Sequence, residues 1–269
     1  MSTGTHPPPA HGYPDAFVAQ CLDDVLAQDA RIHGITGLQG TGKSTLAAQM
    51  VELAAQRGKT VAVLSIDDVY LDHDARAALG RDVHPLLATR GPPGTHDVAL
   101  ACTTLDALRA GRPTALPRFD KIGDRRVQAA DWPLAGPVDL VLLEGWFLST
   151  PPQSADQLLE PINALERDED CDGAWRRYCN DALASEYPAL WQRIDRLLFL
   201  QGPGFEVVPD WRWQQEQTLQ AANPHRKAMT RAQVDRFVQF FERTSRQAMR
   251  TLPGIADRSV PLDAERHPL

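Results

Sequence analysis

The chain has 269 residues, 43% hydrophobic and 23% charged, so it is long enough to bury a large core. Its formal net charge of -7 argues against a nucleic-acid-binding protein, which needs a basic surface to neutralise phosphates. The first residues lack the apolar segment of a signal peptide, and no apolar run reaches the roughly 18 residues of a membrane helix, so we expect a cytoplasmic protein without membrane partners.

Short apolar segments and helical patterns alternate along the chain. Residues 1–13 are rich in Pro, Gly and His and predict a mobile tail before a domain at 14–269. Apolar spacing predicts helices at 14–28, 43–56, 95–111, within 171–194 and from Thr230, where Thr230 and Gln233 form a capping-box pattern. Short β-like runs predict strands at 31–37, 60–66, 138–146 and 196–202. The alternation indicates a doubly wound α/β sheet, with a helical insertion at about 152–194 and a lid at about 203–230.

A phosphate-binding loop is predicted after the first strand. The chain matches the pattern G-x-x-x-x-G-K-[ST] there, between a predicted strand and a predicted helix, which is the context that this motif requires. Its glycines let backbone N–H groups surround phosphate oxygens, and the start of the helix adds partial positive charge. Lys43 can reach the β- and γ-phosphates, and the hydroxyl of Ser44 can bind Mg²⁺. The predicted nucleotide-binding residues are Gly37, Leu38, Gln39, Gly40, Thr41, Gly42, Lys43, Ser44 and Thr45.

Carboxylates end two further predicted strands. Glu144 closes "VLLEG", at the edge where open α/β sheets bind ligands, and can order water bound to Mg²⁺; the alternative is a surface carboxylate. "SIDDVY" carries Asp67 and Asp68, of which strand alternation allows one to point inward. That carboxylate can accept the proton of an alcohol substrate, or instead cap the helix that follows. A GTPase is poorly supported, because "FDKIGD" lacks the Asn of N-K-x-D.

Seven segments together resemble one branch of the P-loop kinases. They are "GLQGTGKST", "SIDDVYL", "RGPPGTHD", "LPRFDKIGDRR", "VLLEGWF", "PINALERDEDCDGAWRRYCNDAL" and "WRWQQEQTL", in that order. The chain resembles the D-glycerate 3-kinase-like branch, whose relatives are uridine kinase, pantothenate kinase and phosphoribulokinase. The resemblance spans nearly everything after about residue 15. It implies a P-loop three-layer α/β/α sandwich with a mostly parallel sheet, ATP as donor and Mg²⁺ as cofactor.

The resemblance also implies roles for individual residues. It makes Asp67 the base, with Lys43 and Arg212 as the other catalytic residues, and it assigns Ser44, Asp67 and Glu144 to Mg²⁺. An exposed helix arginine is the alternative for Arg212. The substrate residues it implies are Tyr70, Arg90, His96, Asp97, Asp120, Lys121 and Arg125.

An acidic acceptor needs cationic partners, and the arginines of these loops, Arg126 included, can bind a carboxylate with two hydrogen bonds. The alternative is that Thr95 or Asp97 caps a helix, the arginines are solvated and His96 is a packed loop residue. One departure concerns Ile122, which stands alone between "FDK" and "GDR" where the family pattern has a longer Ser/Gly-rich segment. A different acceptor would follow if that segment shapes the acceptor site.

The sequence therefore predicts an ATP-dependent small-molecule kinase that transfers the γ-phosphoryl group to an alcohol hydroxyl. D-glycerate or a similar small hydroxy acid is the leading acceptor. A nucleoside- or pantothenate-type kinase is the alternative within the same class, and a regulatory nucleotide-binding ATPase without an acceptor is the alternative from another class. The clusters "DD", "RG…THD" and "FDK" argue against the ATPase, because an ATPase needs no second pocket.

Overall fold

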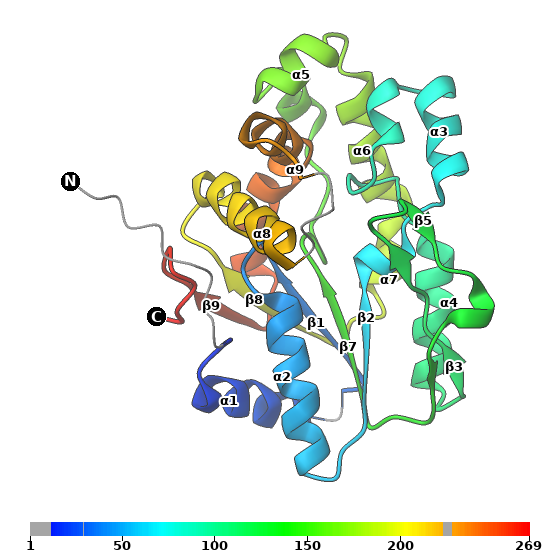
Figure 1. The fold of residues 1–269 in the computed structure, drawn as a ribbon, viewed down its shortest axis with the longest axis vertical. Helices are drawn as coiled ribbons and strands as arrows, with labels where there is room; N and C mark the ends of the chain where they lie inside the picture. The colour runs from blue at the N-terminus through cyan, green and yellow to red at the C-terminus, as the bar shows by residue number, and fades with distance from the viewer. Residues whose placement is uncertain (1–11, 29, 223–227) are drawn as a thin grey trace.

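A five-stranded parallel sheet forms the centre of the molecule. The computed structural model describes residues 12–28, 30–222 and 228–269 (Figure 1). The strands follow the order β2-β7-β1-β8-β9, and every neighbouring pair is parallel. They are β1 (Ile32–Gly37), β2 (Val61–Ser65), β7 (Leu140–Gly145), β8 (Arg196–Gln201) and β9 (Arg258–Pro261). The four strands predicted from the sequence are confirmed, whereas β9 was not predicted.

Helices cover both faces of this sheet and make the predicted three-layer sandwich. On one face, α1 (Asp15–Leu26) and α2 (Lys43–Gln56) enclose one apolar cluster. On the other, α4 (Val98–Arg109), α6 (Ala174–Ser185), α7 (Tyr187–Trp191) and α9 (Arg231–Thr251) enclose a larger one. The P-loop fold predicted for this chain is therefore confirmed. Among the described residues, none of the helices has the length and apolar character needed to cross a membrane.

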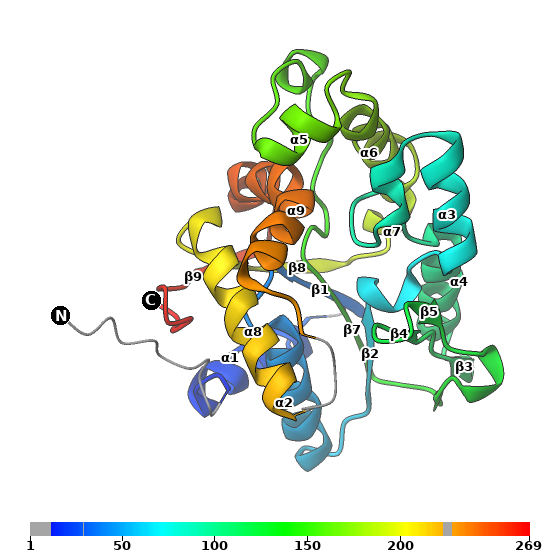
Figure 2. The same cartoon turned by 45° about the horizontal axis from the view of Figure 1, so that its top comes forward.

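Several further helices lie near the carboxyl ends of the strands. Helices α3 (His73–Asp82), α5 (Ala164–Glu169) and α6 gather beyond that edge at the top of Figure 1. Figure 2 shows α8 (Val208–Ala222) beside α2 and α9. Two small antiparallel ladders complete the chain, β3 (Thr114–Ala115) with β6 (Leu134–Ala135) and β4 (Phe119–Asp120) with β5 (Arg125–Arg126).

Two boundaries differ from the sequence predictions. Residues 1–11 of the predicted tail lie outside the described residues, but Tyr13 is only 5% exposed and packs with α1 and α2, so the folded part includes Tyr13. The helical stretch 171–194 is divided into α6 and α7, because Pro188 stands in the first turn of a new helix, where it needs no N–H. The predicted lid at 203–230 contains α8, and its residues 223–227 lie outside the described part. The capping box of Thr230 and Gln233 is confirmed at the start of α9.

Candidate active site

The glycine loop joins β1 to α2 and leaves no room for side chains at its turns. Gly40 and Gly42 have φ of 87° and 89°, in the left-handed region that favours glycine. A Cβ on Gly40 would lie 2.7 Å from Cβ of Trp211. Helix α2 begins at Lys43, so its first N–H groups open onto the loop. The local geometry is that of an anion-binding helix start.

Lys43 is buried within this loop, at 8% exposure. Its Nζ donates hydrogen bonds to the carbonyls of Gly37 and Leu38, both at 2.8 Å. Burial disfavours the charged amine and lowers the pKa of Lys43 to about 8. A nearby phosphate would favour the charged form, so this amine is suited to bind one.

Ser44 and Glu144 place two oxygens together beside the loop. The Ser44 hydroxyl donates to Oε1 of Glu144 at 3.1 Å, and Glu144 is 7% exposed. Parallel pairing aligns Glu144 with Ile35 of β1 and Ser65 of β2, which puts its carboxylate at the ligand-binding edge of the sheet. A hydroxyl and a carboxylate oxygen are ligands that Mg²⁺ accepts together with phosphate oxygens, so this pair fits the predicted magnesium site.

Asp67 and Asp68 follow β2 in a 3₁₀ turn, Ile66–Val69. Oδ2 of Asp67 lies 2.6 Å from Nζ of Lys121, and its Oδ1 accepts the Tyr70 hydroxyl at 2.6 Å. Asp68 turns elsewhere and pairs with Arg118 at 3.1 Å. The two carboxylates diverge as expected. Strand alternation was the wrong reason, because a 3₁₀ turn separates them. The alternative role as a helix cap is also wrong, since Asp72 caps α3.

The charge of Lys121 controls the ionisation of Asp67. Burial opposes the charged carboxylate, but the charge and the hydrogen bond of Lys121 outweigh it and lower the pKa of Asp67 to about 2. The same ion pair raises the pKa of Lys121 against the opposing effect of burial. Asp67 is therefore ionised across the whole neutral range, but it is a weak base while Lys121 stays in contact.

A short hairpin, residues 118–127, carries Lys121 and is fixed by two arginines from outside it. Arg90 donates to Oδ1 of Asp124 at 2.5 Å and to the Lys121 carbonyl at 3.0 Å. Arg76 is only 1% exposed, contacts the same carboxylate at 2.9 Å and donates to the carbonyls of Leu71 and Ala88. Arg76 was missed by the sequence analysis, because an arginine in a polar helix looks solvated until the hairpin packs on it.

A cavity of about 340 Å³ lies between this hairpin, the P-loop and α8. It brings together six residues of the predicted site, which are Gln39, Asp67, Tyr70, Arg90, Lys121 and Arg212. The rest of its lining is Ile122, Trp146, Gln215, Leu219, Phe237, Val238 and Phe241. Arg212 lies on α8, 3.5 Å from Glu216 and 5.7 Å from the Phe237 ring centre, so the alternative of a solvated helix arginine does not describe it.

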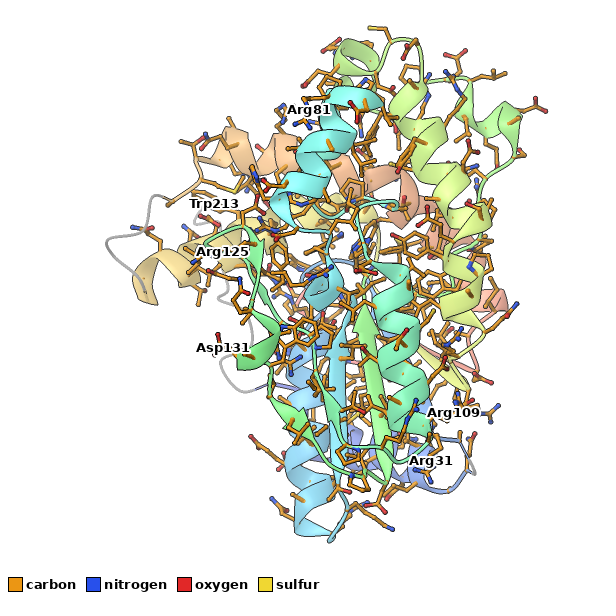
Figure 3. All side chains as sticks on the ribbon, turned by 90° about the vertical axis from the view of Figure 1, so that its right-hand side faces the viewer. Arg31, Arg81, Arg109, Arg125, Asp131 and Trp213 are labelled. Atoms are coloured by element: carbon orange, nitrogen blue, oxygen red, sulfur yellow. The ribbon has the colours of Figure 1, made fainter. Side chains whose placement is uncertain are left out.

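Four predicted substrate residues do not line this cavity. Asp97 caps α4 through the N–H of Leu100 at 2.9 Å and pairs with Arg126, so the alternative role as a cap describes its contacts. Asp120 accepts the N–H of Ile122 inside the hairpin turn. Arg125 is exposed on the hairpin, and Figure 3 shows its place there.

The fourth of them, His96, is a packed loop histidine. Its Nδ1 lies 2.6 Å from the hydroxyl of Tyr187, and that hydroxyl accepts the N–H of Gly94 at 3.0 Å. The Tyr187 hydroxyl can donate its proton to Nδ1 while it accepts from Gly94. Burial lowers the pKa of His96 to about 3, so the ring is neutral. Its ring centre lies 4.8 Å from that of Tyr70, so His96 packs against the residue that donates a hydrogen bond to Asp67.

The parallel sheet, the glycine loop between β1 and α2 and the cavity of about 340 Å³ beside it define a P-loop kinase. A family model described as methylmalonyl Co-A mutase-associated GTPase MeaB matches residues 14–73, the part that carries the P-loop and the second strand. The uncharacterized kinase mug58 of Schizosaccharomyces pombe is 32% identical over 222 residues, which cover 78% of each chain.

Two further relatives extend over nearly the whole chain. The chloroplastic D-glycerate 3-kinase of Arabidopsis thaliana is 29% identical over 96% of this chain, which spans 60% of the length of that protein. The structure of D-glycerate 3-kinase from Cryptococcus neoformans superposes with a TM-score of 0.73 and 26% identity, covering 95% of this chain and 96% of that one. The chain belongs to the D-glycerate 3-kinase-like family of P-loop kinases, which are related to uridine kinase.

Proposed function

We propose that this P-loop kinase transfers the γ-phosphoryl group of ATP to a hydroxyl group of a small hydroxy acid, with D-glycerate as the leading acceptor. One observation carries the proposal. A carboxylate, Asp67, and two cations, Lys121 and Arg90, line one cavity beside the P-loop. A base next to cations is the combination that an acidic alcohol requires. The likeness to the D-glycerate 3-kinases of Arabidopsis thaliana and Cryptococcus neoformans supports the same acceptor.

Different residues of the site bind ATP and the acceptor. Loop N–H groups and Lys43 hold the phosphates, while Arg212 lies across the cavity, where it can neutralise charge on the group being transferred. Ser44 and Glu144 would hold Mg²⁺, which neutralises charge on the β- and γ-phosphates when it is bound. Arg90 and Lys121 bind the acceptor carboxylate, and Asp67 accepts the proton of the attacking hydroxyl.

The ion pair between Lys121 and Asp67 adds a condition to this scheme. With a pKa of about 2, Asp67 takes up a proton poorly while Lys121 contacts it. An acceptor carboxylate competes for the ammonium group of Lys121. As Lys121 turns to the substrate, burial makes Asp67 a stronger base. Binding of an acidic acceptor thus activates the base, which a neutral nucleoside would not do.

A screen of ADP release tests the proposal. The purified protein with Mg-ATP is offered D- and L-glycerate, other hydroxy acids, sugars, nucleosides and pantothenate, with a control that lacks an acceptor. We expect turnover to require an acceptor and to be fastest with a small hydroxy acid. Equal ADP release with and without every acceptor would instead support the regulatory ATPase. Faster turnover with nucleosides or pantothenate would support the alternative kinases.

A further inference from the structure

Arg76 lies on α3 and is only 1% exposed, although it does not line the cavity of about 340 Å³. Burying a guanidinium group is costly unless its charge is paired and its N–H groups are hydrogen-bonded. The proposed function gives Arg76 no direct contact with either substrate. Its contacts within the protein therefore indicate what the buried charge does.

Three separate segments of the chain meet at the guanidinium group of Arg76. Its Nε donates to the carbonyl of Leu71 at 3.0 Å, and its Nη1 donates to the carbonyl of Ala88 at 2.8 Å. Its Nη2 donates to the carbonyl of Asp124 at 3.2 Å and lies 2.9 Å from Oδ1 of the same residue. All three guanidinium nitrogens are therefore used, and one side chain ties the three segments together.

Each of these three segments also carries a residue of the cavity. Tyr70 immediately precedes the first carbonyl, Arg90 follows the second by two residues, and Lys121 precedes the carboxylate by three. Two of these residues contact the proposed base, because Tyr70 donates to Asp67 at 2.6 Å and Lys121 pairs with it at 2.6 Å. Arg76 therefore fixes, from behind, the segments that place the proposed base and both cations of the acceptor site.

Asp124 lies between two arginines, and this arrangement sets the charge beside the cavity. Its Oδ1 lies 2.9 Å from Nη2 of Arg76 and accepts from Nη1 of Arg90 at 2.5 Å. Both guanidinium groups also lie over the Phe119 ring, at 5.9 and 5.7 Å from its centre. A carboxylate paired with Arg90 alone would cancel its charge, whereas two guanidinium groups and one carboxylate leave a net positive charge. Arg76 thus keeps Arg90 attractive to an anion.

We propose that Arg76 is a positioning residue for the acceptor. It holds Arg90 and Lys121 at the cavity, and it balances the carboxylate of Asp124, which would otherwise compete with the acceptor carboxylate for Arg90. The inference rests on the proposed function, because it requires an acidic acceptor. It adds that acceptor binding depends on a buried charge outside the cavity, whereas ATP binding does not.

Replacement of two buried arginines separates positioning from a general loss of stability. Arg76→Met removes the charge and keeps a long side chain. Arg176→Met is the matched control, because Arg176 is 5% exposed, pairs with Asp170 at 3.0 Å and does not line the cavity. Steady-state kinetics, with ATP and the hydroxy acid that the wild type uses fastest varied in turn, give the two KM values. Urea denaturation gives the stability of each variant.

Two further variants test how Arg76 acts. Arg76→Met combined with Asp124→Asn also removes the carboxylate that would compete for Arg90. Arg76→Lys keeps the charge but loses the planar fork that contacts all three segments. It is the milder change, and its kinetics decide the question if Arg76→Met does not fold.

We expect Arg76→Met to raise the KM for the acceptor by about tenfold or more, and Arg76→Lys by about threefold or more, with the KM for ATP changed by less than about twofold in both. The double variant should recover part of the acceptor affinity. Arg176→Met should lose stability, as Arg76→Met does, but change either KM by less than about twofold.

An unchanged acceptor KM in the Arg76 variants, or an equal rise in both KM values, would overturn the positioning role and leave the kinase proposal standing. A double variant that binds the acceptor no better than Arg76→Met would overturn the charge balance on which the role depends. A wild type that turns over no hydroxy acid would overturn the proposed function itself.

Discussion

The carboxylate of Asp67 is the residue on which the proposed chemistry depends most directly. Asp67→Asn removes the basic oxygen but keeps the size of the side chain. We expect kcat to fall by roughly 10²–10⁴, the usual contribution of a positioned general base. Mg-ATP binding should change little, because Lys43 and the loop amides do not depend on Asp67. Asp68→Asn is the matched control, since Asp68 pairs with Arg118 and does not line the cavity of about 340 Å³ that Asp67 lines. Weakened Mg-ATP binding with little loss of kcat would instead make Asp67 a metal ligand.

The pKa of this carboxylate gives a second test at the same scale. Lys121 holds the pKa of Asp67 near 2 against the effect of burial. Lys121→Met removes that charge, so burial alone should raise the pKa of Asp67. On acidification, the variant should then lose activity at a higher pH than the wild type does, because its Asp67 is protonated at a higher pH. The profile of kcat/KM for the acceptor against pH, at saturating Mg-ATP, measures the shift, because it reports the enzyme before the acceptor draws Lys121 away from Asp67. Arg118→Met, which removes the partner of Asp68, should leave the acid limb in place. An unmoved acid limb in Lys121→Met would contradict the coupling.

At the scale of elements, the hairpin 118–127 decides which cations reach the acceptor. Arg90 lines the cavity between the hairpin and the P-loop, whereas Arg125 is exposed and does not. We expect Arg90→Ala to raise the KM for the acceptor by about tenfold or more and the KM for ATP much less, because a contact with the acceptor carboxylate is lost. Arg125→Ala should change either constant by less than about twofold. Steady-state kinetics with each substrate varied in turn measure both effects. A larger effect at Arg125 would mean that the hairpin moves when the acceptor binds.

The same elements show what the sequence could predict. The run "LVLLEG" became β7 and Lys43 became the first residue of α2, because continuous apolar runs and the glycine motif have strong local causes. Strand β9 has only the residues "RSVP", and its place is set by pairing with β8 rather than by a local pattern. The hairpin has two-residue strands that depend on contacts with Arg76 and Arg90.

Some residues of the candidate site could be predicted from local sequence patterns, and others could not. Carboxylates at strand ends could be placed, because parallel strands bring their carboxyl ends to one edge. The roles of Asp97 and His96 could not be predicted, because Asp and His occur in helix caps and packed loops as well as in substrate sites. Tyr13 and Arg266 both contact the P-loop from distant parts of the chain, and the chain that carries Arg266 is placed there by the pairing of β9 with β8.

At the scale of the whole molecule, a buried ion pair connects the helical insertion to α9. Arg243 on α9 contacts both carboxylate oxygens of Glu166 on α5, at 2.7 and 2.5 Å, and Glu166 is fully buried. Arg243→Met should lower the free energy of unfolding by about 3–5 kcal/mol, because it leaves a buried carboxylate without its partner. The double variant that adds Glu166→Leu should recover part of the loss. Urea denaturation measures both. A double variant less stable than Arg243→Met would show that packing and not the unpaired charge causes the loss.

Nucleotide binding should stabilise the whole molecule, because the P-loop contacts α2, α8 and both ends of the described chain. At a Mg-ATP concentration one hundred times its Kd, we expect the free energy of unfolding to rise by about 2.7 kcal/mol. Lys43→Met should remove most of this increase.

The substitution Lys43→Met should cost the free protein little stability, because burial lowers the pKa of Lys43 to about 8 and makes its charged form unfavourable in the fold. That unfavourable contribution is present below pH 8 and disappears as the pH rises, since the folded state then loses its proton before the unfolded state does. Thermal melts of both proteins with and without Mg-ATP, at pH 7 and pH 9, measure these effects. A wild-type protein whose melting temperature does not change with Mg-ATP would contradict the assignment of the glycine loop to a nucleotide.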